Sequence, residues 1–118
     1  MDLLEIRKFL IQDDIYKLEI LEDAGSFREF YKVYRNGELL VTAGKYSNAL
    51  RCIITAYEIP AKEGRAYIME GTEYNIITHP DCCTLIYKYR IDSSSTMRVF
   101  DDEWHCLNWI LCGYHYRD

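Results

Sequence analysis

Two stretches of the sequence bring together side chains that could do chemistry. The first, "HPDCC", starts at His79, and the second, "HCLNWILCGYH", ends at His115. Two residues separate His79 from Cys82, and the same spacing separates Cys112 from His115. Two imidazoles and two thiolates are a ligand set that suits tetrahedral zinc. These four residues therefore form an alternative metal site.

The simpler interpretation is that the thiols bind nothing. If the adjacent Cys82 and Cys83 enter a strand, they point to opposite faces of the sheet, and neither half-site has the usual glycine of a zinc knuckle. Cysteines in regular structure are most often small buried apolar residues. Five cysteines, an odd number, without a secretory signal indicate reduced thiols. We therefore expect no cofactor, with zinc as the alternative.

Nucleophilic catalysis finds little support in the sequence. A cysteine, a histidine and an acid could combine, for example Cys83, His105 and Asp101. Such a group needs an activated thiol within hydrogen-bond reach of its base, which spacing alone does not provide. No glycine-rich phosphate loop, HExxH or GxSxG pattern occurs in the sequence. We predict no catalytic residues and a protein that is not an enzyme.

Length, charge and hydropathy narrow the class of protein. A chain of 118 residues fits one domain, spanning residues 1–118. Its net charge is −5 and its basic residues are scattered, which argues against nucleic acid as a partner. No apolar stretch approaches the roughly 20 residues of a membrane helix, and the acidic start does not resemble a signal peptide. We expect a cytoplasmic protein with no membrane partner.

Eleven tyrosines and two tryptophans are many for this length. Both residue types combine a large contact area with a polar group and are enriched at protein interfaces. The alternative is that the tyrosines fill sheet positions, which aromatic residues favour.

The elements that would position these residues are a short helix followed by runs of strands, each run ending in a longer helix. Asp2 and Glu5 have the spacing of a capping box, and the following apolar residues recur at helical spacing, so we predict a helix at about 2–12. Residues 36–37 are Asn-Gly, a strong hairpin signal, which should pair Tyr34 with Leu39 and the residues on either side of them. Two longer helices follow, one capped by Ser47 and one by Asp101 or Asp102.

Two segments share one order of elements. Residues 15–59 and 66–116 each contain a strand, a hairpin and an amphipathic helix, at an offset of about 57 residues. Tyr16 then corresponds to Tyr74. Shared apolar periodicity could produce part of this match. We predict a β-β-β-α duplication and an α+β fold with antiparallel sheets and the helices on one face.

The last helix offers a binding surface. A helical wheel places Trp104 on an apolar arc with Leu107 and Tyr114, and His105 and Trp109 on the polar side. An exposed tryptophan is typical of a residue that dominates a protein interface. We therefore predict partner binding by the residues of this face, namely Trp109, His105 and Tyr116. Alternatively, Trp109 packs on the C-terminal tail or on the first helix.

One face of the sheet is the second candidate surface. Tyr34 and Lys32 are expected on the face away from the helices, which could hold an acidic partner or a small anion. Such a face is more often simply solvated, with long side chains lying over the aromatic rings.

The sequence thus predicts a non-catalytic protein-binding module with the general character of small inhibitors, such as immunity and counter-defence proteins. A small-ligand or nucleotide sensor with a pocket between the repeats or at a dimer interface is the alternative. A zinc-stabilised interaction module is the third hypothesis. A homodimer is compatible with all three.

Elemental analysis of protein purified without added zinc tests the metal hypothesis. We expect no bound zinc, because the thiols are interpreted as apolar filler. About one zinc per chain, with thiols protected from modification, would instead establish a structural metal site.

Overall fold

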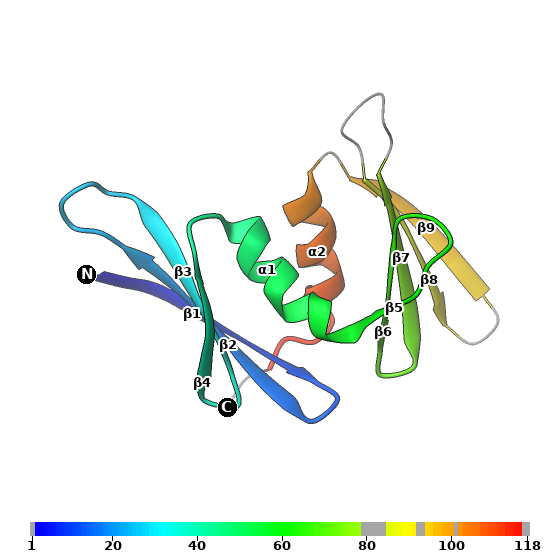
Figure 1. Ribbon diagram of the computed structural model, residues 1–118, viewed down its shortest axis with the longest axis horizontal. Coiled ribbons are helices and arrows are strands. Elements are labelled where there is room, and N and C mark those ends of the chain that lie inside the picture. Colours follow the sequence, from blue (N-terminus) through cyan, green and yellow to red (C-terminus); the bar gives the residue numbers. More distant parts are fainter. Residues whose placement is uncertain (1, 79–84, 92–93, 101, 117–118) are drawn as a thin grey trace.

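The computed structural model describes residues 2–78, 85–91, 94–100 and 102–116. Two antiparallel sheets lie on either side of a pair of helices (Figure 1), and the fold is therefore α+β, as predicted. Sheet A has the strand order β1-β2-β3-β4, and sheet B has the order β5-β6-β7-β8-β9. None of the described helices is long and apolar enough to cross a membrane.

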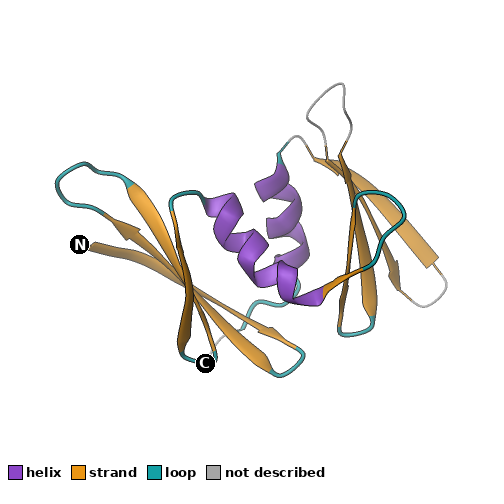
Figure 2. Cartoon of the chain, in the orientation of Figure 1, coloured by secondary structure: helices purple, strands orange, loops and turns teal. Residues whose placement is uncertain are grey.

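Each sheet is a meander of consecutive strands followed by a helix (Figure 2). The elements of the first half are β1 (Asp2–Ile11), β2 (Asp14–Glu22), β3 (Glu29–Arg35), β4 (Glu38–Ala43), α1 (Tyr46–Ile54) and a 3₁₀ turn (Thr55–Tyr57). Those of the second half are β5 (Glu58–Ile59), β6 (Arg65–Met69), β7 (Thr72–Thr78), β8 (Leu85–Ile91), β9 (Ser94–Phe100) and α2 (Glu103–Cys112).

The N-terminal helix predicted at about 2–12 is wrong, because this segment is strand β1. Phe9 and Ile11 are buried against the helices, whereas Leu3, Ile6 and Leu10 are exposed. Apolar residues on both faces of the strand hide its period-two pattern and imitate helical spacing. Pairing along nearly the whole length of β2 outweighs the local helical preference.

The predicted Asn36-Gly37 turn is confirmed, with positive φ at both residues and Tyr34 opposite Leu39. The pairing departs from the prediction one step later, where a bulge leaves Leu40 unpaired and places Val33 opposite Val41. Helix α1 begins at Tyr46, so Ser47 lies inside it and does not cap it. Asp102 is the residue preceding α2, as predicted, although its side chain makes no capping hydrogen bond.

The two helices share one hydrophobic core with both sheets. Apolar residues of every layer are at most 2% exposed, among them Leu18, Val33, Leu50, Ile53, Tyr67, Leu107 and Ile110. No charged residue of the described chain is buried. The buried side chains that the helices place between the sheets are therefore uncharged.

A pair of tyrosine hydroxyls is buried where α1 meets sheet A. The hydroxyl oxygens of Tyr16 and Tyr57 lie 2.9 Å apart. Tyr57 donates to the carbonyl oxygen of Ile11 at 3.2 Å, so Tyr16 is the donor within the pair. Burial, together with the hydrogen bonds to Tyr16 and to Asp14, raises the pKa of Tyr57 well above its usual range.

The same arrangement occurs where α2 meets sheet B. The hydroxyl oxygens of Tyr74 and Tyr114 lie 3.0 Å apart, and Tyr114 donates to the carbonyl oxygen of Met69 at 3.2 Å. Burial again raises the pKa of Tyr114. In each half, a tyrosine that follows the helix thus donates to the last residue of a strand, Ile11 of β1 or Met69 of β6.

The two halves also meet at equivalent hairpin turns. Gln12 and Glu70 occupy the first turn positions of β1–β2 and β6–β7, with φ of 49° and 51°. The backbone N–H of Gln12 donates to Glu70 Oε1 at 3.2 Å, and the N–H of Glu70 donates to Gln12 Oε1 at 2.9 Å. This reciprocal pair joins sheet A to sheet B.

The segment after each helix joins the sheet of the other half. After α1, β5 pairs with β6 of sheet B. After α2, Tyr116 N–H donates to the carbonyl oxygen of Lys8 at 2.9 Å, and Leu10 N–H donates to that of Tyr114 at 2.9 Å. Backbone hydrogen bonds of each half thus extend into the sheet of the other half.

Tyr57 and Tyr114 each donate to a backbone carbonyl, and replacing either of them by phenylalanine should destabilise the protein to a similar extent. In Tyr57→Phe and Tyr114→Phe, a buried partner hydroxyl and a carbonyl lose their hydrogen bonds, and we expect a loss of about 1–3 kcal/mol. Urea unfolding measures it, with Tyr34→Phe as the partly exposed control, which should change little. Equal stability of the control and the two core variants would contradict the role of the pairs.

Candidate functional site

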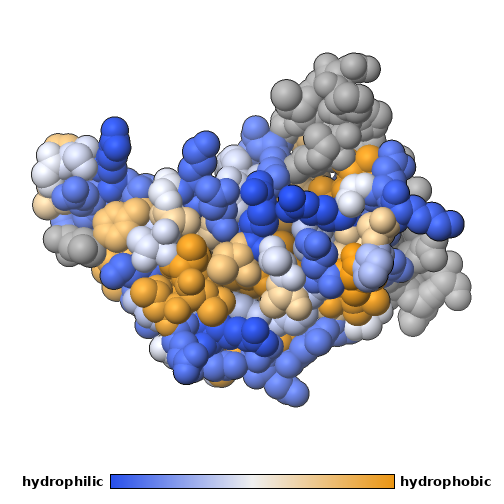
Figure 3. Space-filling view, viewed as in Figure 1, coloured by the Kyte–Doolittle hydropathy of each residue, from blue (hydrophilic) through white to orange (hydrophobic). Residues whose placement is uncertain are grey.

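An open groove lies where sheet A extends beyond the helices. Near the N-terminus and the β2–β3 connection, the sheet projects past the helix pair (Figure 1), and the outline of the molecule is indented there (Figure 3). The groove has a volume of about 600 Å³. It is lined by Leu4, Glu5, Arg7, Ile20, Glu29, Tyr31, Tyr46 and Trp104.

The floor of the groove is formed by the same helix-facing side of sheet A that contributes to the core. Ile20 and Tyr31 are cross-strand partners on the helix-facing side of sheet A. The register of β1 shifts between Leu3 and Glu5, which leaves Leu4 unpaired at the groove, and its side chain is 49% exposed. A regular end of the sheet thus forms the floor, and an irregular end of β1 forms one wall.

Four aromatic rings from three elements form a continuous stack beside this floor. The ring centroids of Tyr31 and Tyr46 are 5.5 Å apart, and those of Tyr46 and Trp104 are 6.0 Å apart. The ring of His105 lies 3.6 Å from Trp104 at an interplanar angle of 30°. The stack therefore runs from β3 across the start of α1 to the first turn of α2, and Trp104 is 41% exposed.

Hydrogen bonds hold the central ring in place. Arg7 donates to the hydroxyl of Tyr46, and that hydroxyl donates to Asn108 Oδ1 at 3.2 Å. Burial raises the pKa of Tyr46, although the neighbouring guanidinium opposes this. Arg7 also donates to Glu5 at 3.1 Å. Burial alone would lower the pKa of Arg7, but these partners raise it.

Carboxylates surround the aromatic stack at the end of sheet A. Asp2 lies opposite Glu22, and Glu22 lies opposite Glu29, so three acids form a row across three strands. Like charges in directly opposite positions destabilise a sheet unless a cation lies between them. Burial and the hydrogen bond to Glu29 raise the pKa of Tyr31 to about 12, which keeps the phenol neutral. Among the groove-lining residues, Arg7 is the one cation.

The structure places Trp109 away from this groove. Its side chain is half-buried, packs against the core and lies beside Phe100 of β9, with ring centroids 6.3 Å apart. The guanidinium of Arg98 lies over the indole at 5.4 Å. His105 is exposed, and its Nδ1–H donates to Asp102 Oδ2 at 3.1 Å. Among the residues predicted for partner binding, only His105 joins the aromatic stack.

The remaining predicted partner-binding residues lie elsewhere. Tyr116 is half-buried in the C-terminal segment. Tyr34 and Lys32 lie on the face of sheet A opposite the helices, where Lys17 Nζ stands 4.4 Å from the Tyr34 ring. Lys32 faces Glu19 across the strands. These residues form no common site with His105.

Trp104 was predicted to face the core, and its exposure corrects that prediction. It belongs to the first turn of α2, where the Tyr46 ring, and not a sheet, lies against it. One feature of the sequence could have indicated the aromatic stack. Tyr31 and Tyr46 lie on either side of the predicted hairpin, just before the first long helix. The groove residues Leu4 and Arg7 were hidden by the incorrect helix.

The hypothetical zinc ligands are only partly within the described residues. His79 and Cys82 lie outside them. Cys112 and His115 are exposed. The described residues contain no cluster of three metal-ligating side chains, and Cys52, Cys106 and Cys112 are free thiols. Burial raises the pKa of Cys106 to about 12, which makes that thiol unreactive in the folded chain.

Comparison of the chain with protein-family models, with curated proteins and with solved structures gave no match in any of the three.

The two tryptophans should differ in their access to a quencher. In Trp109→Phe the remaining Trp104 is exposed, and in Trp104→Phe the remaining Trp109 is packed beside Phe100. We therefore expect acrylamide to quench the fluorescence of Trp109→Phe more steeply than that of Trp104→Phe. The reverse order would contradict the placement of the groove.

Proposed function

We propose that this protein is a non-catalytic binding module that docks a basic segment of a protein partner in the groove. The segment would carry Lys or Arg together with at least one apolar side chain. The observation that carries this proposal is the exposed aromatic stack of Tyr31, Tyr46, Trp104 and His105 beside a row of carboxylates.

The stack has the properties of an interface centre. Tryptophan and tyrosine contribute a large share of the binding free energy in protein complexes. Here Tyr46 is held by Arg7 and Asn108, and Trp104 lies between two other rings. Because these side chains are already ordered, little conformational entropy would be lost when a partner covers them.

The charge of the groove selects the partner. The carboxylates of Asp2, Glu5, Glu22 and Glu29 gather at one end of the sheet, and only Arg7 opposes them in the groove. A cationic partner would relieve their mutual repulsion and could also lie over the aromatic rings. The net charge of −5 would speed the association with such a partner at low salt. This is the general character of small inhibitors, and the free thiols of Cys52, Cys106 and Cys112 suit a cytoplasmic setting.

We also infer that the chain arose by internal duplication, with a unit of four strands and a helix in place of the three strands predicted. Residues 2–57 and 65–114 would be the two copies. The matching tyrosine pairs, the reciprocal bonds between Gln12 and Glu70, and the exchanged segments after the helices support this inference. Tyr57 and Tyr114 are then equivalent residues.

Self-association remains a proposal for the same end of the sheet. The part of β1 before Arg7 has no strand on its outer side among the described residues, and Leu3 and Ile6 are exposed there. An edge of this kind suits pairing with a second copy. Light scattering during the peptide experiment would detect a dimer.

Selection from a display library of random peptides tests the proposed function. We expect enrichment of sequences with several Lys or Arg residues around an aromatic or aliphatic residue. Trp104→Ala should weaken a selected peptide by about 2 kcal/mol, which is about 30-fold. Glu29→Gln should weaken it less, and raised salt should weaken it further.

The matched control is Tyr34→Ala, which removes an aromatic ring from the opposite face of sheet A. This variant should bind the selected peptide like the unchanged protein. Enrichment of acidic peptides, or loss of binding in Tyr34→Ala but not in Trp104→Ala, would overturn the proposal.

A further inference from the structure

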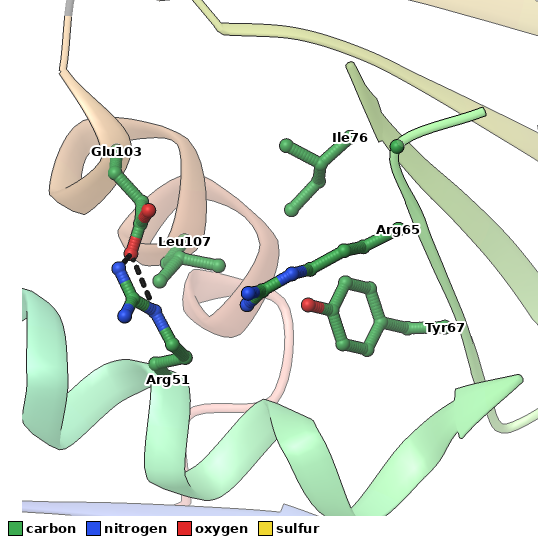
Figure 4. Close-up of a pocket in the computed structure, with 7 residues that line it drawn as sticks. Arg51, Arg65, Tyr67, Ile76, Glu103 and Leu107 are labelled. Atoms are coloured by element: carbon green, nitrogen blue, oxygen red, sulfur yellow. Dashed lines mark hydrogen bonds and ion pairs between the residues drawn. The ribbon is translucent and has the colours of Figure 1, made fainter. Parts of the chain in front are cut away.

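A second, smaller cavity lies between the helix pair and sheet B (Figure 4). Its volume is about 250 Å³. Residues of both helices and of two strands line it, namely Arg51, Gly64, Arg65, Tyr67, Ile76, Glu103 and Leu107. It shares no lining residue with the groove.

The cavity has an apolar floor and a charged mouth. Tyr67, Ile76 and Leu107 are 1%, 8% and 2% exposed. Arg51 and Glu103 are roughly one-third exposed, with relative side-chain areas of 39% and 35%. A ligand that fits both parts must carry an apolar group and a charged or polar head.

A glycine closes one wall of the cavity. Gly64 has φ +66°, and a Cβ at this position would stand 2.1 Å from the carbonyl oxygen of Ile76. Only a residue without a side chain lets the loop lie this close to β7. The cavity wall is therefore built by a close backbone approach that other residues would prevent.

The mouth carries the guanidinium groups of Arg51 and Arg65 and the carboxylate of Glu103, and the carboxylate of Glu58 is near enough to act on Arg65. Arg51 donates through Nε to Glu103 Oε1 at 2.8 Å and through a second nitrogen to the same oxygen, so these two charges compensate each other. The guanidinium of Arg65 points into the cavity next to the Tyr67 hydroxyl (Figure 4). Among the described residues, no carboxylate lies within ion-pair distance of Arg65. Glu58 and Glu103 act on Arg65 only from beyond ion-pair distance, so its guanidinium has N–H donors left for an anion.

The corresponding arginine of the first half differs in this respect. Arg7 precedes the buried Phe9 by two residues, just as Arg65 precedes the buried Tyr67. Arg7, however, is bonded to Glu5 and to the Tyr46 hydroxyl. The second half therefore has an arginine without a carboxylate in ion-pair distance among the described residues, beside the hydroxyl of Tyr67, where the first half has a paired arginine beside Phe9.

We propose that this cavity binds a small monocarboxylate with a short branched apolar chain. Arg65 would bind the carboxylate by a paired hydrogen bond, which the planar guanidinium favours. The Tyr67 hydroxyl positions that guanidinium, and Ile76 and Leu107 contact the apolar chain. The volume lies below the usual range for drug-sized ligands, so the proposed ligand is smaller than a nucleotide.

Calorimetric titration with 3-methylbutanoate tests the proposal. We expect saturable binding with a Kd of about 1 mM or lower. Acetate, which lacks the branched chain, should bind more weakly, and the uncharged 3-methylbutanamide should not bind. Inorganic phosphate, which has no apolar part, should also bind more weakly than 3-methylbutanoate.

Two variants assign the site. Arg65→Gln should weaken 3-methylbutanoate about 10- to 100-fold, the usual effect of removing a charge-assisted hydrogen bond. Arg28→Gln, which removes an exposed arginine from the loop before β3, is the charge-matched control and should bind normally. Equal weakening in both variants, equal binding of acid and amide, or no saturable binding by a folded protein would overturn the proposal.

Discussion

The whole structure depends on one shared core, because both short helices are packed against each other and between two sheets. Helices of nine and ten residues are unstable alone, so their stability comes from packing. Leu50 and Ile53 of α1, and Leu107 and Ile110 of α2, are at most 2% exposed. The tyrosine pairs and the exchanged strand segments link the layers further. Each candidate site is therefore built by parts of both halves of the chain.

The first turn of α2 connects the two sites. Glu103 lines the cavity between the helix pair and sheet B, and the next residue, Trp104, lines the groove. Neighbouring side chains on a helix diverge by about 100°, so one turn can serve two faces. The groove is open and is lined by Glu5 and Glu29, whereas the cavity is smaller and is lined by Arg51 and Arg65. The two places therefore offer different chemistry.

The α+β class, the Asn36-Gly37 hairpin and the approximate helices were predictable, because turn chemistry and apolar periodicity are local signals. The first strand was not, since apolar residues on both faces of β1 imitate a helix, and its pairing with β2 is not visible locally. The groove was not predicted either, because its position depends on contacts between elements that are distant in the sequence. Whether Trp104 or Trp109 is exposed depends on what packs against α2, and helical spacing alone cannot supply that information.

The most direct test is to map a selected basic peptide on the isotope-labelled protein by NMR. The structure leads us to expect the largest chemical-shift changes at the indole N–H of Trp104 and at the backbone amides of Leu4, Tyr31 and Tyr46, with little change at Tyr34. Shifts centred on Tyr34 and the outer face of sheet A, with Trp104 unaffected, would contradict the groove as the binding site.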